Sequence, residues 1–139
     1  MPGRVINLHT SYLPYNRGSS PNFFSFLENT PKGVTIHLMS AGLDEGDILC
    51  QRELHFDEEK ETFASTYEAL LQEIEKLFRE NWQQIREGSI IPVKQAGPVT
   101  YHRMKDLDAI RGKVDFDWNM KIGDFKRAYE KAMRKDENS

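Results

Sequence analysis

The stretch that decides the fold runs Ile6-Asn7-Leu8-His9-Thr10-Ser11-Tyr12-Leu13-Pro14. Residues 5–9 are short and largely apolar, and a Leu-Pro pair follows, which is typical of a buried strand that leads into a loop. Because side chains alternate along a strand, Asn7 and His9 are expected on one face. The stretch therefore predicts a strand that delivers an amide and an imidazole to the same side of a sheet.

Two further strands are predicted downstream, over residues 33–39 and 48–54. The loop between them contains Gly42 and Gly46 and carries Asp44. A carboxylate is thus expected close to the two strands that flank it.

Helices are predicted in three places. Ser20 and Pro21 form a good helix start, with Ser20 as N-cap and Pro21 at the first helical position, so a short helix is expected over residues 21–29. Residues 62–87 form the longest predicted helix, because apolar residues recur there at spacings of three and four and Gly88 follows as a C-cap.

The remainder of the chain is predicted to be less regular. Residues 90–102 contain two prolines and a glycine and are expected to be extended, and a closing helix is predicted over residues 124–134. Residues 135–139 are expected to fray.

Composition bounds the class of protein. The chain has 139 residues, enough for one domain with a single core. A formal net charge of -3 gives no overall attraction to phosphate backbones, so nucleic acid is not an expected partner. The single cysteine, Cys50, excludes an internal disulfide, and neither a leader nor a long apolar run is seen. A cytoplasmic protein without a membrane segment is expected.

Several spaced motifs together resemble the catalytic half of the formyltransferases that use 10-formyltetrahydrofolate. They are Asn7-Leu-His9, Leu13-Pro14, Arg17-Gly18, Pro21, Gly33-Val-Thr-Ile-His37 and Leu43-Asp44-x-Gly46-Asp47-Ile48. Further motifs are more typical of the nucleotide-sugar N-formyltransferases within that family, namely Tyr15-Asn16-Arg17-Gly18, Pro21-Asn22-Phe23, Thr30-Pro31-Lys32-Gly33, Thr100-Tyr101-His102 and Lys105-Asp106. The resemblance covers about residues 3–108.

The resemblance implies an α/β fold, the C-terminal part of a Rossmann-like formyltransferase fold, with a few-stranded sheet, a long helix and a short C-terminal extension. Residues 1–90 would form the catalytic portion. Residues 91–139 would form the extension with its closing helix, either in the same domain or as a small appendage. The N-terminal half of the family pattern has no counterpart in the sequence, so a truncated chain is expected, and the strand at residues 5–9 would present an apolar edge.

The resemblance assigns the catalytic roles to Asn7, His9 and Asp44. In formyl transfer an amine attacks the formyl carbon, and Asn7 and His9 would donate to the oxyanion that forms. Asp44 would orient His9 and help the attacking nitrogen to lose its proton. Taken singly, the same residues could be a capping amide, a satisfied core histidine and a turn aspartate. His37 and Asp47 are expected to be structural.

Binding residues are also implied. Folate contacts are expected from Met39, Ser40, Gly42 and Leu43, together with Asp44. Substrate contacts are expected from Ser11, Arg17 and Tyr101. For Arg17, binding of a phosphate or carboxylate and simple surface pairing stay equally open, and the segment around Tyr101 could instead be a solvated loop.

Two further choices stay open at this level. Phe23, Phe24 and Phe26 could pack a helix on the sheet or border the substrate. His55 and His102 lack the spacing of metal ligands, and no metal site is predicted.

The resulting hypothesis is an enzyme that transfers the formyl group of 10-formyltetrahydrofolate to the amino group of a nucleotide-linked deoxyamino sugar. The nucleotide is expected to be dTDP, and the product is expected to serve polysaccharide biosynthesis. One alternative is formyl transfer to methionyl-tRNA. Another is an inactive remnant that assembles with a partner through its strand edge or long helix. A homodimer is left open.

Overall fold

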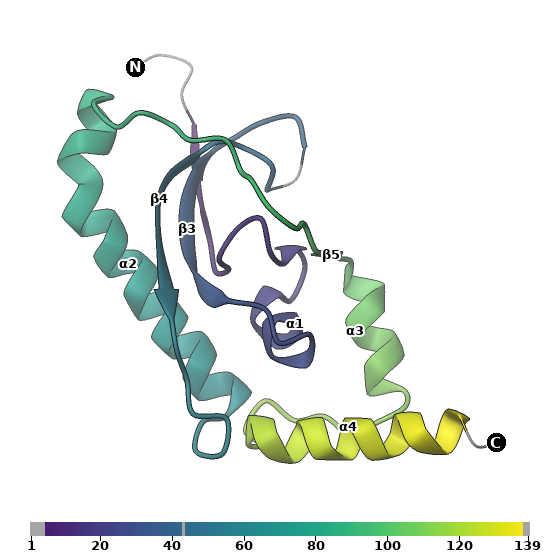
Figure 1. Ribbon diagram of the computed structural model, residues 1–139. Helices are drawn as coiled ribbons and strands as arrows, with labels where there is room; N and C mark the ends of the chain where they lie inside the picture. The colour runs from purple at the N-terminus through teal and green to yellow at the C-terminus, as the bar shows by residue number, and fades with distance from the viewer. Residues whose placement is uncertain (1–4, 43, 138–139) are drawn as a thin grey trace.

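The computed structural model describes residues 5–42 and 44–137 as an α/β fold built around a small sheet (Figure 1). Its elements in chain order are β1 (Ile6–His9), β2 (Arg17–Gly18), α1 (Pro21–Leu27), β3 (Lys32–Leu38), β4 (Ile48–Leu54), α2 (Phe63–Glu87), β5 (Tyr101–His102), α3 (Met104–Arg111) and α4 (Ile122–Glu137).

The main sheet has three antiparallel strands in the order β1-β3-β4. In the register of β1 against β3, Asn7 lies opposite His37 and His9 lies opposite Thr35. This pairing places the amide of the first strand beside an imidazole of the second. β1 is an edge of the sheet, and Val5 and Leu8 are exposed there.

Helix α2 lies along the sheet and packs against β3 and β4 (Figure 1). Its start is a capping box, in which the Thr62 hydroxyl accepts from the Ser65 N–H and the Ser65 hydroxyl accepts from the Thr62 N–H. Gly88 ends the helix in a left-handed conformation with φ 70°. The apolar stripe of α2 and the inner face of the sheet form one core cluster, made of Val34, Ile36, Leu70, Ile74 and Leu77.

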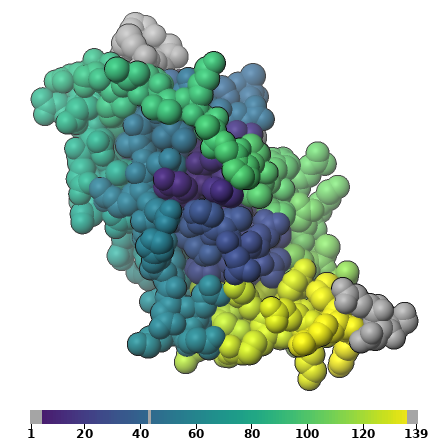
Figure 2. Space-filling model, in the orientation of Figure 1, coloured from purple at the N-terminus to yellow at the C-terminus, as the bar shows by residue number. Residues whose placement is uncertain are grey.

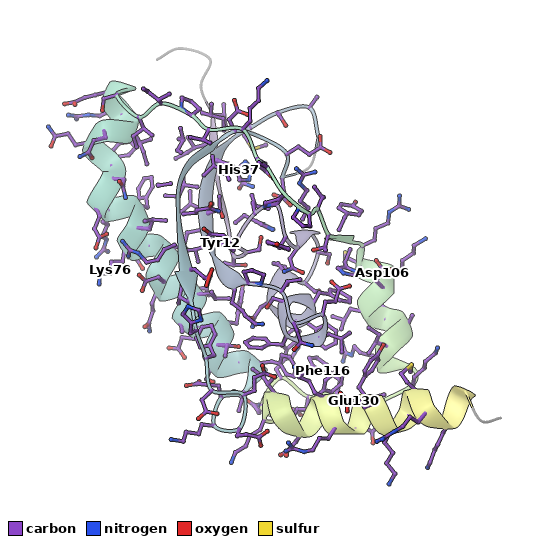
Figure 3. All side chains as sticks on the ribbon, viewed as in Figure 1. Tyr12, His37, Lys76, Asp106, Phe116 and Glu130 are labelled. Carbon is purple, nitrogen blue, oxygen red and sulfur yellow. The ribbon has the colours of Figure 1, made fainter. Side chains whose placement is uncertain are left out.

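A second core cluster is rich in aromatic side chains and is called the aromatic cluster below. Its buried members are Phe23, Phe24, Phe26, Phe63, Leu107, Val114, Ile122 and Phe125. Phe63 at the start of α2 meets the rings of Phe23 and Phe125 at centroid distances of 5.5 and 5.6 Å. Figure 3 shows Phe116 in this region, between α1 and α4, where its ring lies 5.3 Å from that of Phe63. Residues from both sides of position 90 therefore share one core.

The segment after α2 returns across the molecule to the loop that follows β1. Figures 1 and 2 show it as the green chain that runs from the end of α2 toward α3. On the way, Val93 bridges to Ile48, and β5 then pairs in parallel with β2, with Arg17 opposite Tyr101 and Gly18 opposite His102. This return fixes residues 16–19 against the C-terminal part of the chain.

Most predicted elements are confirmed within a few residues. The strands, the helix at residues 21–29, the helix at residues 62–87 and the extended segment at 90–102 correspond to observed elements. Ser20 stands at the N-cap position of α1, but its side chain makes no capping hydrogen bond. The prediction of fraying from residue 135 is wrong for residues 135–137, because α4 continues to Glu137, and α3 was not predicted.

Across residues 5–42 and 44–137, no helix combines the length and the apolar character that a membrane crossing requires.

Candidate active site

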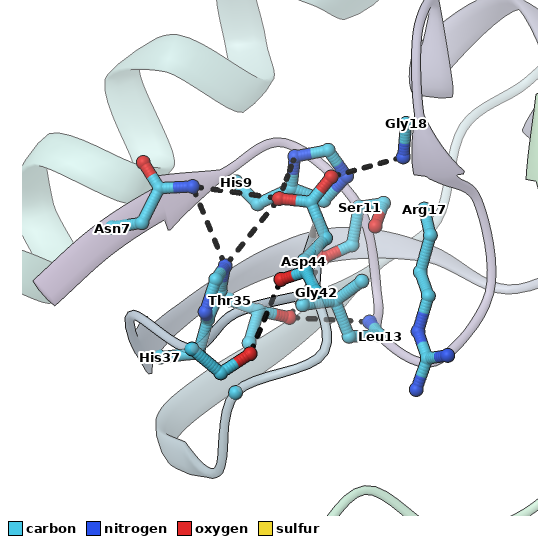
Figure 4. Close-up of polar contacts among 12 residues, drawn as sticks. Asn7, His9, Ser11, Leu13, Arg17, Gly18, Thr35, His37, Gly42 and Asp44 are labelled. Carbon is cyan, nitrogen blue, oxygen red and sulfur yellow. Dashed lines mark hydrogen bonds and ion pairs between the residues drawn. The ribbon is translucent and has the colours of Figure 1, made fainter. Parts of the chain in front are cut away.

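Two of the predicted catalytic residues, Asn7 and His9, converge on the carboxylate of the third, Asp44 (Figure 4). Its Oδ1 lies 3.4 Å from the Asn7 Nδ2, 3.6 Å from the His9 Nδ1 and 3.5 Å from the Nε2 of His37. Asn7 and His9 come from β1, His37 comes from β3, and Asp44 comes from the loop between β3 and β4. These four residues are called the Asp44 cluster below. The sheet register creates it, since Asn7 and His37 are cross-strand partners.

The loop that carries Asp44 has an unusual backbone. Asp44 has φ 55°, in the left-handed region, which costs about 1–3 kcal/mol for a residue other than glycine. Gly46 allows the loop to approach β3 closely, because a Cβ at this position would lie 1.5 Å from the carbonyl oxygen of Leu38. The surrounding contacts must therefore hold Asp44 in place.

The second oxygen of Asp44 is held by the chain backbone. Its Oδ2 accepts a hydrogen bond of 2.9 Å from the Gly18 N–H. Gly18 has φ 90°, and a Cβ there would lie 2.3 Å from the carbonyl oxygen of His102, so only glycine fits. The pairing of β2 with β5 thus presents a backbone donor to the carboxylate.

The surroundings set the charges of the cluster. Burial alone would raise the pKa of Asp44, but the hydrogen bond with His37, the charge of His9 and the Gly18 N–H outweigh it and lower that pKa. Burial would lower the pKa of His37, but its hydrogen bonds to Asp44 and to the Leu38 carbonyl raise that pKa above its ordinary value. A carboxylate at Asp44 beside a readily protonated His37 is the favoured arrangement.

His9 differs from His37. Burial dominates and lowers the pKa of His9, although the Asn16 carbonyl and the Asp44 charge oppose it. Its Nε2 lies 2.9 Å from the Asn16 carbonyl oxygen, and its Nδ1 faces Asp44. A neutral imidazole carries one N–H, so neutral His9 donates to one of these two acceptors at a time.

A pocket of about 220 Å³ opens beside the cluster. It is lined by Asn7, His37, Met39, Ser40, Ala41, Gly42 and Asp44. The predicted folate contacts Met39, Ser40 and Gly42 therefore lie around the same hollow as two of the predicted catalytic residues. Leu43, the remaining predicted folate contact, lies outside the described residues.

The predicted substrate contacts are distributed differently. Ser11 is buried, and its hydroxyl donates 2.8 Å to the Tyr15 carbonyl, so its observed contact holds the loop after β1. Arg17 donates from Nε and Nη2 to the Gln95 Oε1, at 3.2 and 2.9 Å. Tyr101 is exposed, and its ring passes directly over Gly18. The structure thus brings Arg17 and Tyr101 near the Asp44 cluster, whereas Ser11 lies in the loop that follows β1.

His37 was predicted to be structural, although its Nε2 lies 3.5 Å from the Asp44 Oδ1. The signal was its strand position, because His37 faces Asn7 once β1 and β3 are paired. Gly18 was present in a motif, but its N–H contact with Asp44 had no signature in the sequence. Such backbone contacts depend on the tertiary fold.

Fold and site together define a small α/β scaffold with an amide, an imidazole and a carboxylate at one pocket, and with the His9 imidazole beside the same carboxylate. A family model described as formyl transferase matches residues 1–81, and the chain belongs to this family.

Relatives sharpen the comparison. The dTDP-4-amino-4,6-dideoxyglucose formyltransferase of Mycobacterium bovis is 33% identical over 122 residues, which are 88% of this chain and 51% of that protein. A methionyl-tRNA formyltransferase of Clostridium botulinum is 36% identical over 104 residues, covering 74% of this chain and 33% of that one. The chain therefore spans about half or less of the length of these two curated relatives.

A solved structure is similar over most of the fold. It is the formyltransferase PseJ from Anoxybacillus kamchatkensis, in complex with UDP-4,6-dideoxy-4-formamido-L-AltNAc and tetrahydrofolate. The TM-score is 0.80 with 47% sequence identity, over 85% of this chain and 62% of that one.

Proposed function

We propose that this chain transfers the formyl group of 10-formyltetrahydrofolate to the 4-amino group of a nucleotide-linked 4-amino-4,6-dideoxy sugar. The observation that carries the proposal is the convergence of Asn7, His37 and Asp44 on one pocket beside the Met39–Gly42 loop. The names of two relatives support the substrate, since one acts on a dTDP-linked 4-amino sugar and the other binds a UDP-linked 4-formamido sugar.

The reaction requires few groups. The neutral sugar amine attacks the formyl carbon, a C–N bond forms, and the bond from that carbon to N10 of the folate breaks. One proton leaves the sugar nitrogen and one arrives on N10. Since an amine is already a nucleophile, the protein has to stabilise the oxyanion and move a proton.

The residues of the Asp44 cluster suit these tasks. Asn7 lies at the pocket, and its amide N–H groups are donors suited to the oxyanion. Asp44 has a lowered pKa, which keeps it ionised but makes it a weaker base than an ordinary carboxylate. Its position at the pocket is what suits it to accept the proton of the attacking amine. The geometry supports an indirect role for His9, which contacts Asp44 through Nδ1 while Nε2 lies against Asn16. In the proposed reaction His37 holds the same carboxylate from the other side.

Five of the binding assignments belong to the same proposal. Met39, Ser40 and Gly42 would contact the folate, because they line the pocket beside Asp44. Arg17 and Tyr101 would face the nucleotide sugar. The compartment is proposed to be the cytoplasm, where nucleotide sugars and reduced folates are both available, and the product would enter polysaccharide synthesis.

The test is release of tetrahydrofolate, with mass detection of the formamido product, from 10-formyltetrahydrofolate and a panel of dTDP- and UDP-linked amino sugars. Asp44→Asn is expected to lower kcat about 10²- to 10⁴-fold, because the proton acceptor is lost. Asn tolerates the left-handed backbone at this position. The matched control is Asp47→Asn, the same change three residues along the loop, which is expected to leave kcat close to wild type.

Formylation of methionyl-tRNA with no transfer to any sugar would reject the substrate class. A folded chain that transfers formyl to neither acceptor would reject the activity itself, and association with a partner would then become the function to test.

A further inference from the structure

Gln95 lies in the extended segment between α2 and β5, outside the 81 residues that match the family model. This segment crosses the molecule beside the loop of Asp44 (Figure 1). Gln95 is part-buried and was not singled out by any motif in the sequence.

The side-chain amide of Gln95 is fully used. Its Nε2 donates to the carbonyl oxygens of Asp44 and Gly46, both at 2.8 Å. Its Oε1 accepts from the Nε and Nη2 of Arg17, at 3.2 and 2.9 Å. An amide offers two N–H donors and an oxygen with two lone pairs, so all four positions have a partner. The reversed amide would face the guanidinium with its N–H groups, which excludes a flipped orientation.

These contacts act where the backbone needs support. The backbone of Asp44 is in the left-handed conformation. The side chain of Gln95 donates hydrogen bonds to its carbonyl group and to that of Gly46, two residues later. The same segment also positions the carboxylate of Asp44. The Arg17 N–H donates to the Thr100 carbonyl, and this contact fixes the neighbouring Gly18, whose N–H donates to the Asp44 Oδ2. Both the main chain and the carboxylate of Asp44 are therefore oriented by residues 95–102.

We propose that Gln95 is a positioning residue for formyl transfer, which aims the Asp44 carboxylate at the pocket by holding the left-handed turn of its backbone against Arg17. The inference rests on the proposed function for its effect on rate. Gln95 touches no reacting atom and acts through Asp44.

The test compares Gln95→Met, which keeps the length of the side chain and removes every hydrogen bond, with Gln72→Met as a matched control on the exposed face of α2. Gln95→Met is expected to lower kcat about 10- to 100-fold with little change in the KM for the sugar, since small displacements of a catalytic group have effects of this size. Gln72→Met is expected to retain the wild-type kcat.

A second readout does not depend on turnover. The pKa of the His37 imidazole is measured by NMR titration of the full chain without substrate. In the wild type, Asp44 holds this pKa above its ordinary value, and His9 is the other titratable group that faces the carboxylate. In Gln95→Met, a carboxylate that is no longer held near the Nε2 of His37 is expected to let that pKa fall. A general loss of stability would not move the pKa of the folded state.

A second variant separates the donors from the acceptor. Gln95→Glu keeps oxygens for Arg17 but cannot donate to the carbonyl groups of Asp44 and Gly46, so its kcat is expected to fall as well. It also carries the test if Gln95→Met does not fold.

A wild-type kcat in Gln95→Glu, or an unchanged His37 pKa in folded Gln95→Met, would overturn the inference. If the wild-type chain transfers no formyl group to any acceptor, the proposed function fails. The His37 titration then still decides whether Gln95 holds Asp44.

Discussion

The aromatic cluster and the Asp44 cluster are both buried, yet they are built on opposite principles. The aromatic cluster joins apolar side chains from α1, α2, α3 and α4 and contributes to stability through burial and ring contacts. The Asp44 cluster buries a carboxylate and two imidazoles around a left-handed residue, and such groups reduce stability unless every partner is present. The comparison indicates that the aromatic cluster stabilises the fold, and that this stability offsets the cost of holding the polar groups of the Asp44 cluster in place.

The largest effect on the free energy of unfolding is expected in the aromatic cluster. Phe63→Ala removes a side chain that is 1% exposed and is expected to lower the free energy of unfolding by about 3–5 kcal/mol. The measurement is denaturant unfolding, with Phe63→Leu as a control that keeps more of the apolar volume and loses less. Activity per folded molecule should stay near the wild type. A loss of activity in the folded fraction as large as that in Asp44→Asn would abolish the distinction between the two clusters.

At His37 a loss of activity is expected instead of a loss of stability. In His37→Asn the amide replaces Nδ1, which contacts the Leu38 carbonyl, and removes the Nε2 that faces Asp44. His37→Gln replaces Nε2 and removes Nδ1. Orientation of a catalytic group contributes up to about 100-fold in rate, so kcat should fall by about this factor in His37→Asn and less in His37→Gln. Equal losses in the two variants would show that the contact with Asp44 is not the important one.

The start of α2 offers a change in the scaffold alone. Thr62→Ala removes the hydroxyl that accepts from the Ser65 N–H and is expected to cost about 1 kcal/mol of stability. Thr62→Ser keeps the cap and serves as control. Thermal unfolding measures the difference, and kcat should be unchanged, because the cap lies beside the aromatic cluster and contacts no member of the Asp44 cluster. A fall in kcat would mean that the two clusters are coupled through α2.

The last expected effect in the wild type is the response of stability to pH, because His9 and His37 act on opposite sides of pH 6.5 and the free energy of unfolding should pass through a maximum near that value. The raised pKa of His37 stabilises the fold below the ordinary histidine value of 6.5, and this contribution is lost as pH rises through its folded pKa. The lowered pKa of His9 favours the fold above 6.5, and this contribution is lost as pH falls through its folded pKa.

Single substitutions should expose the two opposed contributions. Relative to the wild type, His37→Gln should be most destabilised on the acidic side of 6.5, and His9→Gln on the basic side. The measurement is denaturant unfolding of both variants across a pH series. If both variants show the same pH dependence, the opposed assignment of the two histidines is wrong.

The fold was readable from the sequence where local patterns are strong. The helix of residues 62–87 was predicted from a repeating apolar stripe with a cap at each end, and α2 spans Phe63–Glu87. The strand at residues 48–54 was predicted with the observed bounds. Helix α3 was missed, because its eight residues bury only Leu107 and carry little periodic signal. The closing helix extends beyond its predicted end, since no capping residue or proline stops it after Arg134.

The site was readable in part. Asn7, His9 and Asp44 were predicted from the family resemblance, and the structure places the Asn7 Nδ2 and the His9 Nδ1 at 3.4 and 3.6 Å from the Asp44 Oδ1. Their catalytic roles stay a prediction. His37, Gly18 and Gln95 reach Asp44 from positions 7, 26 and 51 residues away along the chain, and no local pattern specifies such contacts.

The sequence by itself determined most of the elements and the residue types, because hydrophobic periodicity, caps and turn glycines act over a few neighbouring residues. It also determined membership of the formyl transferase family, whose model matches residues 1–81. Only the tertiary structure decided how the carboxylate is held. Strand register sets His37 opposite Asn7, the pairing of β2 with β5 aims the Gly18 N–H, and the returning segment brings in Gln95. These contacts are long in sequence and short in space, and they form only when the whole core is packed.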